Sequence, residues 1–218
     1  MNNNIKYTIK DGLITNSNVK VETYSNIEQG EMAEVNAIVL HRTAGSTAQS
    51  ALNGYKGGQK VGAHFLIDKE GKIYQTASLT KLCWHVGIMY SRGRKESSAD
   101  PKELKNINAI LHESNVSFSN RVKNLSRYEA KKAYPIRYPS NADSVGIEVV
   151  GRYNAGTKQF TEPTQKQYNS TKWLVEVLIK EYALGLRKDV YAHGSIARKK
   201  EAEGIQLLNY LHKGRTSE

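Results

Sequence analysis

Three short apolar segments of this chain each carry a side chain that is costly to bury. His41 directly follows residues 37–40, His193 follows residues 190–192, and Glu148 interrupts residues 145–150. Short apolar runs bounded by glycine and polar residues are typical of buried strands. A charged or metal-binding group on such a strand needs a partner to offset its desolvation. The pattern therefore predicts that strands bring two histidines and a glutamate to one point, as in a hydrolytic zinc site.

Taken singly, each of these residues has a simpler explanation. A histidine beside a strand is more often structural than metal-binding, and Glu148 has 32 lysines and arginines with which to pair. The sequence around each residue is more informative. Six segments around these and neighbouring residues form recognisable motifs. In chain order they are residues 39–44, 62–67, 68–75, 84–87, 144–148 and 192–199.

In their order and spacing, the six segments resemble the N-acetylmuramoyl-L-alanine amidases of the type-2 amidase and peptidoglycan-recognition-protein superfamily. The resemblance extends from about Val35 to about Gly204, which is most of the chain. Any one of these motifs is weakly specific, whereas the six together are strongly specific. The resemblance implies that residues 35–218 form an amidase catalytic domain.

The alternation of segment types predicts the fold class. A helix is expected from near Thr161 to Gly185, because apolar residues recur there at helical spacing. Strands alternating with helices around a hairpin predict an α/β fold, in which a central mixed β-sheet is flanked by helices. The other expected segments are strands over 37–40, 63–68, 73–76, 145–150 and 189–192, and helices over 47–58 and 205–211.

Residues 1–34 are predicted to form a short β-rich extension. Residues 5–10 and 19–24 alternate between apolar and polar side chains, and Asp11-Gly12 is a hairpin turn signal. We expect the extension to pack against the main sheet rather than to function alone.

Residues 88–143 form a long basic insertion where the family usually has a modest loop. Loops longer than ~12–15 residues without structure of their own are uncommon in compact domains. Helical signals are present over 100–113 and 126–133. The insertion is either a solvated surface elaboration or a lid or wall that holds the substrate.

The resemblance also implies which residues bind zinc. His41 and His193 correspond to the two histidine ligands of the family. Glu203, ten residues after His193, stands where one branch has an aspartate ligand. Glu201 is the alternative third ligand, and a two-histidine site completed by water is another. The segment departs from the Lys-x-Asp-Pro-Gly form of the family, which leaves the third ligand open.

Four further residues receive roles from the same resemblance. Glu148 corresponds to the glutamate that acts as base in one branch of the family. Another branch uses a tyrosine, and Ala63 stands at that position here, which leaves the role to Glu148. Lys199 corresponds to the group that stabilises the oxyanion. His64 and His85 correspond to positions that line the substrate groove, where each is either a substrate contact or a buried structural residue.

Composition limits the partners. The formal net charge of +11 indicates an anionic partner. Nucleic acid is disfavoured, because the basic residues are scattered and no nucleic-acid-binding motif accompanies them.

No apolar segment approaches the ~20 residues that span a bilayer. Residues 1–6 lack the apolar core of a signal peptide. The single Cys83 excludes an intrachain disulfide and is expected to be buried.

These expectations define a zinc-dependent enzyme that hydrolyses the amide between N-acetylmuramic acid and L-alanine in peptidoglycan or muropeptides. A non-catalytic peptidoglycan-binding module and a cytoplasmic muropeptide-recycling amidase are the alternatives. We expect synthesis in the cytoplasm and action in the periplasm or cell wall. Delivery is expected as a type VI secretion effector, with an immunity protein as partner, or as a phage endolysin.

Overall fold

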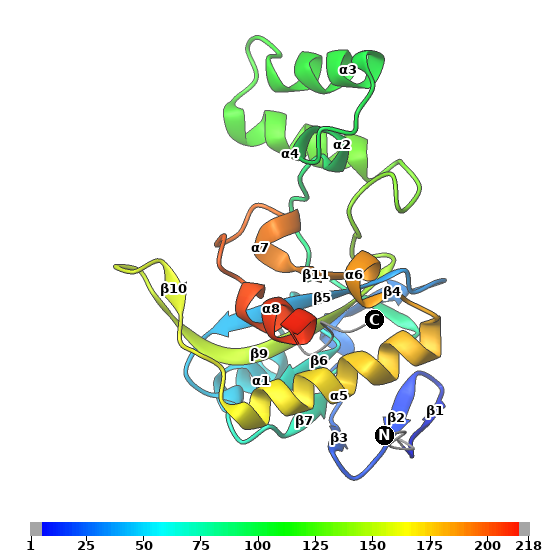
Figure 1. Cartoon of the computed structure of the whole chain (residues 1–218), viewed down its shortest axis with the longest axis vertical. Helices are drawn as coiled ribbons and strands as arrows, with labels where there is room; N and C mark the ends of the chain where they lie inside the picture. The colour runs from blue at the N-terminus through cyan, green and yellow to red at the C-terminus, as the bar shows by residue number, and fades with distance from the viewer. Residues whose placement is uncertain (1–5, 214–218) are drawn as a thin grey trace.

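The computed structural model describes residues 6–213, which form a mixed β-sheet with helices on both faces (Figure 1). The strand order is β11-β5-β9-β6-β7-β3, and β10 pairs with β9. The four strands from β11 to β6 are parallel, whereas β7 runs antiparallel to β6. The predicted α/β fold with a central mixed sheet is confirmed. The strands are β3 (Val19–Val21), β5 (Ala37–Ala44), β6 (Phe65–Ile67), β7 (Ile73–Gln75), β9 (Ser144–Asn154), β10 (Gln159–Phe160) and β11 (Val190–Ala192).

Two helices cover one face of the sheet, α5 (Gln165–Tyr182) and α8 (Ile205–Lys213). Leu174 and Leu178 of α5 are fully buried in the largest core cluster. The helix begins later than expected, because Thr164 and not Thr161 caps it, in a capping box with Gln167. The N–H of Thr161 instead donates to the carbonyl of Arg152 and extends the β9–β10 ribbon.

The opposite face of the sheet carries the polar residues. Alternate residues of a strand point to opposite faces, so Ile38 and Leu40 of β5 pack in the core beneath α5, whereas Val39 and His41 lie on the other face. Helix α1 (Ala48–Lys56) covers part of that face with a second apolar cluster. The strands therefore bury one face completely and leave the other for the site.

The N-terminal extension differs from the predicted hairpin. Residues 8–10 (β1, Thr8–Lys10) pair with β2 (Leu13–Thr15), not with residues 19–24. Asp11 and Gly12 both have positive φ, which closes a two-residue turn and selects the immediately following segment as partner. Strand β3 instead joins the edge of the main sheet, parallel to β7. Ile5, the first residue of the expected strand, lies outside the described residues, as do the others of 1–5.

A short connection completes this end of the molecule. The 3-10 helix Ser25–Ile27 leads into β4 (Glu28–Glu31), which pairs with β8 (Lys81–Cys83) in a separate two-stranded sheet. Cys83 is fully buried, as expected.

The insertion folds into three helices, α2 (Arg92–Lys95), α3 (Pro101–Leu111) and α4 (Phe118–Glu129), at one end of the molecule (Figure 1). The expected helix over 100–113 is confirmed, but α4 begins at the cap Ser117, well before residue 126. The fully buried Glu129 pairs with Lys132 at 2.7 Å, and Lys132 also pairs with Glu103 of α3. None of the described helices is both long and apolar enough to cross a bilayer.

Candidate active site

Three buried side chains converge on the open face of the sheet. His41 lies near the end of β5, His193 is the first residue of the short helix α7 (His193–Ile196) after β11, and Glu203 lies in the loop before α8. Glu203 Oε1 is 2.8 Å from Nδ1 of His193 and 3.4 Å from Nδ1 of His41. One ligand atom from each residue lies within 4.8 Å of the others. The group is therefore compact enough to surround one metal ion.

The hydrogen bonds around the two imidazoles fix which nitrogens face the centre. His193 Nε2 donates to the carbonyl of Val86 at 2.8 Å. His85 Nε2 lies 3.1 Å from the carbonyl of Ser144, so it donates and leaves His85 Nδ1 as an acceptor. His41 Nε2, 3.0 Å from that Nδ1, must then be the donor. In both His41 and His193, Nε2 carries the proton, and the lone pair of Nδ1 points to Glu203.

This arrangement fits a cation. Burial, together with the neighbouring His193, lowers the pKa of His41 to about 3. Two imidazole lone pairs and a carboxylate repel one another unless a positive charge lies between them. Outer hydrogen bonds that orient the histidines are a general feature of metal sites.

Glu148 lies beside His41 on the neighbouring strand. The two residues are in register between β5 and β9, and adjacent strands are ~4.8 Å apart. Glu148 is half-buried, and its Oε2 has no hydrogen-bond partner among the described residues. Burial and then the charge of Glu203 raise its pKa to about 8, against the opposing effects of Lys199 and Arg42. A carboxyl group in this state is suited to accept and release a proton near neutral pH.

Lys199 supplies positive charge at the rim of the site. Its side chain is exposed and lies over Gly87, where a Cβ atom would stand 3.6 Å from Lys199 Cε. Its charge lowers the pKa of both His41 and Glu148. Gly87 has a φ of 74°, so this turn favours glycine.

The two other histidines of the motifs are held by hydrogen bonds. His64 is fully buried, with Nδ1 accepting from the N–H of Gly146 at 3.1 Å and Nε2 donating to the carbonyl of Lys81 at 2.8 Å. His85 is also buried and contacts His41 directly. The structure thus places His85 next to His41 and His64 one layer further out, with both ring nitrogens of His64 in hydrogen bonds. A direct contact of either residue with substrate stays a prediction.

The structure brings Glu203, and not Glu201, to the two histidines. Glu201 is exposed and lines a surface hollow with Tyr153 and Gln206. Sequence reasoning did not find the carbonyl groups of Val86 and Ser144, because a backbone acceptor leaves no residue-type signal.

The buried group of His41, His193 and Glu203 could hold a metal ion, and the carboxyl group of Glu148 lies beside it. A metal ion next to a proton-accepting group suits hydrolysis. The profile of the family described as N-acetylmuramoyl-L-alanine amidase matches residues 31–204. The chain therefore belongs to the N-acetylmuramoyl-L-alanine amidase family. A search of the curated proteins found no match.

Solved structures of similar fold include three amidase-fold proteins. An AmpD selenomethionine derivative has a TM-score of 0.56 at 17% identity, over 94% of this chain and 98% of that one. PlyL has a TM-score of 0.51 at 14% identity, over 91% of each chain. The hydrolase AmiA of Staphylococcus aureus, solved with its ligand, has a TM-score of 0.51 at 13% identity, over 89% of this chain and 82% of that one. At these identities the likeness shows the fold.

Proposed function

We propose that the chain is a zinc-dependent amidase that hydrolyses the bond between the lactyl group of N-acetylmuramic acid and L-alanine in peptidoglycan. The observation that carries the proposal is the convergence of His41, His193 and Glu203. The carboxyl group of Glu148, whose Oε2 has no partner within residues 6–213, lies alongside. Two imidazole nitrogens and one carboxylate are a ligand set that zinc accepts, and a catalytic zinc site keeps a further position open.

Each residue has a defined task in this proposal. Zinc, when bound by His41, His193 and Glu203, supplies a Lewis acid and lowers the pKa of water. Glu148 accepts the proton of the attacking water and then donates it to the departing amine of L-alanine. Lys199 offsets the negative charge that develops on the carbonyl oxygen. His85 and the carbonyl of Val86 orient the two ligand histidines.

Metal removal tests the proposal. Chelation should abolish release of the peptide from a muramoyl peptide, and a stoichiometric amount of zinc should restore it. The alternative, a non-catalytic peptidoglycan-binding module, predicts that the zinc-loaded protein sediments with purified peptidoglycan and releases no peptide. That result would refute the proposed amidase activity and support the peptidoglycan-binding module.

We further propose that the substrate is the cell wall and not a recycled muropeptide. The net charge of +11 supports this role, because it attracts the protein to anionic envelope polymers. A type VI secretion effector is our first choice and a phage endolysin the second. Expression directed to the periplasm should lyse cells, and the product of an adjacent immunity gene should protect them if the protein is an effector. Absence of lysis would favour the recycling enzyme.

A further inference from the structure

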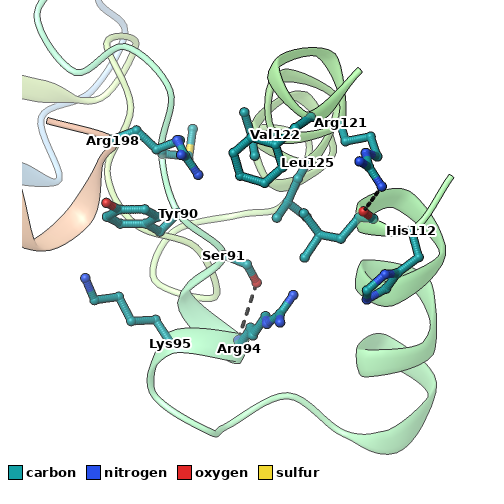
Figure 2. A pocket seen from close by; sticks show the side chains of 12 residues that line it. Tyr90, Ser91, Arg94, Lys95, His112, Arg121, Val122, Leu125 and Arg198 are labelled. Carbon is teal, nitrogen blue, oxygen red and sulfur yellow. Dashed lines mark hydrogen bonds between the residues drawn. The ribbon is translucent and has the colours of Figure 1, made fainter. Parts of the chain in front are cut away.

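A cavity of about 600 Å³ lies between the helices of the insertion and Arg198, the neighbour of Lys199 in the chain (Figure 2). Tyr90 and Arg198 line one side, and α4 lines the opposite side with Val122 and Leu125. Met89, Val122 and Leu125 are buried, so the cavity has an apolar floor. A space of this size accommodates several side chains of a peptide or a small molecule.

Four of the residues that line the cavity are positively charged. Arg94, Lys95, Arg121 and Arg198 line it, and no aspartate or glutamate is among the described lining residues. Arg198 lies over the ring of Phe118 at 5.0 Å, and Lys95 lies over the ring of Tyr90 at 4.3 Å.

Arg121 donates to the carbonyl of Leu111 at 3.0 Å, while its buried Nε has no partner among the described residues. Arg198, Lys95 and Arg121 are thus held by aromatic rings or a carbonyl group. Together with Arg94 they form four cations that repel one another, and an anionic ligand would relieve that repulsion.

Two chain segments connect this cavity to the metal-binding group. The carbonyl of Val86 accepts from His193, and Met89, three residues further on, already lines the cavity. The second segment runs from α7 to Arg198, whose N–H donates to the carbonyl of Ile88 at 2.8 Å. Three extended residues span about 10 Å. A substrate that leaves the site in this direction therefore reaches the cavity within a few residues of peptide.

We propose that this cavity binds the carboxylate groups of the peptide stem of the substrate, an inference that rests on the proposed amidase function. The amino sugars of the glycan are uncharged, because the lactyl carboxyl group is consumed in the scissile amide. The peptide stem carries free carboxylates and aliphatic carbon, which match the cations and the apolar floor respectively. Arginine binds carboxylates through strong, charge-assisted hydrogen bonds.

Equilibrium binding tests the subsite without catalysis. The probes are the tripeptide L-Ala–γ-D-Glu–L-Lys and the same tripeptide with both carboxylates converted to carboxamides. Arg94→Gln and Arg198→Gln should each bind the acidic tripeptide about tenfold more weakly, the loss typical of one hydrogen bond to a charged group. Lys105→Gln is the matched control, since Lys105 is exposed on α3 and does not line the cavity.

Three binding outcomes would overturn the proposal. The first is equal affinity of the wild type for the acidic and the amidated tripeptide. The second is a loss in Lys105→Gln as large as in the two arginine variants, which would indicate diffuse attraction by net charge. The third is binding of a peptide-free disaccharide, with its lactyl carboxyl group amidated, that depends on Arg94 and Arg198, because the cavity would then hold uncharged glycan.

Turnover separates failure of the subsite from failure of the enzyme. On a muramoyl tripeptide, kcat/KM of the arginine variants should fall about tenfold for the acidic form and stay unchanged for the amidated form. Equal activity of variants and wild type on the acidic form would refute the subsite while the amidase stands. If the zinc-loaded wild type cleaves neither form, the proposed function fails, and the tripeptide titration still decides whether the cavity binds carboxylates.

Discussion

At the scale of single residues, the two glutamates that follow His193 offer a direct comparison. Glu203 contacts both His41 and His193, whereas Glu201 is exposed on the surface. We expect Glu203→Ala to lower zinc affinity by at least tenfold, as even outer-shell changes do, and Glu201→Ala to leave it unchanged. A zinc titration of both variants against a competing chelator measures the difference. A larger loss of zinc affinity in Glu201→Ala than in Glu203→Ala would identify Glu201 as the third ligand.

Glu148 allows the catalytic role to be separated from the structural one. Glu148→Gln keeps the shape of the side chain but cannot accept a proton, so turnover should fall by ~10²–10⁴-fold. Zinc content should remain close to that of the wild type, as should the melting temperature of the zinc-loaded protein. A fully active, zinc-loaded variant would remove the proposed base, and Ala63 offers no tyrosine in its place.

The raised pKa of Glu148 also has a signature in stability. In the metal-free protein the folded state holds this proton up to a pKa of about 8, whereas an exposed glutamate releases it near 4.5. The stability contributed by Glu148 is therefore present below pH 4.5 and is lost as the pH rises through about 8. We expect the melting temperature of Glu148→Gln to exceed that of the wild type increasingly from pH 5 to pH 9. A constant difference across this range would show that Glu148 titrates normally.

At the scale of elements, the backbone of the loop before α8 packs in close contact with the backbone of β5. Gly204 has a φ of 84°, and a Cβ atom there would lie 2.2 Å from the carbonyl oxygen of Leu40. Gly204→Ala should push the loop off the strand, move Glu203 away from the histidines, and lower both stability and zinc affinity. Gly58→Ala is the matched control, because Gly58 also has positive φ but open space around it. It should lose only about 1 kcal/mol of stability from backbone strain and bind zinc normally.

The same scale shows what the sequence could predict. Apolar runs that end at His41 and His193 predicted both strands and the convergence of these two residues. Strand β5 continues to Ala44, beyond the expected end at residue 40, so His41 reaches the site from within the strand, whereas His193 directly follows β11. The extension and the insertion were predicted less well. The pairing of β3 with β7 and the start of α4 depend on tertiary packing against the rest of the fold. Local sequence patterns do not contain that information. The orientation of His193 depends on the backbone carbonyl group of Val86, which no residue type indicates. The cationic cavity brings Arg198 next to residues about a hundred positions earlier in the chain, and a local pattern does not predict such a contact.

At the scale of the whole molecule, the net charge of +11 should act on the polymeric substrate far more than on a small one. The Debye length falls from about 10 Å at 0.1 M salt to about 3 Å at 1 M, which removes long-range attraction but spares contacts inside the site. We therefore expect hydrolysis of intact peptidoglycan sacculi to slow several-fold when salt is raised over this range. Hydrolysis of a soluble muramoyl tripeptide with amidated carboxylates should change much less, because that substrate offers neither the anionic polymer nor the groups proposed to enter the cavity. Rates measured on both substrates from one enzyme stock, with zinc content checked at each salt concentration, separate attraction to the wall from loss of metal. An equal decline on both substrates would mean that salt acts on the catalytic site itself, and the charge of the molecule would then have no part in reaching the wall.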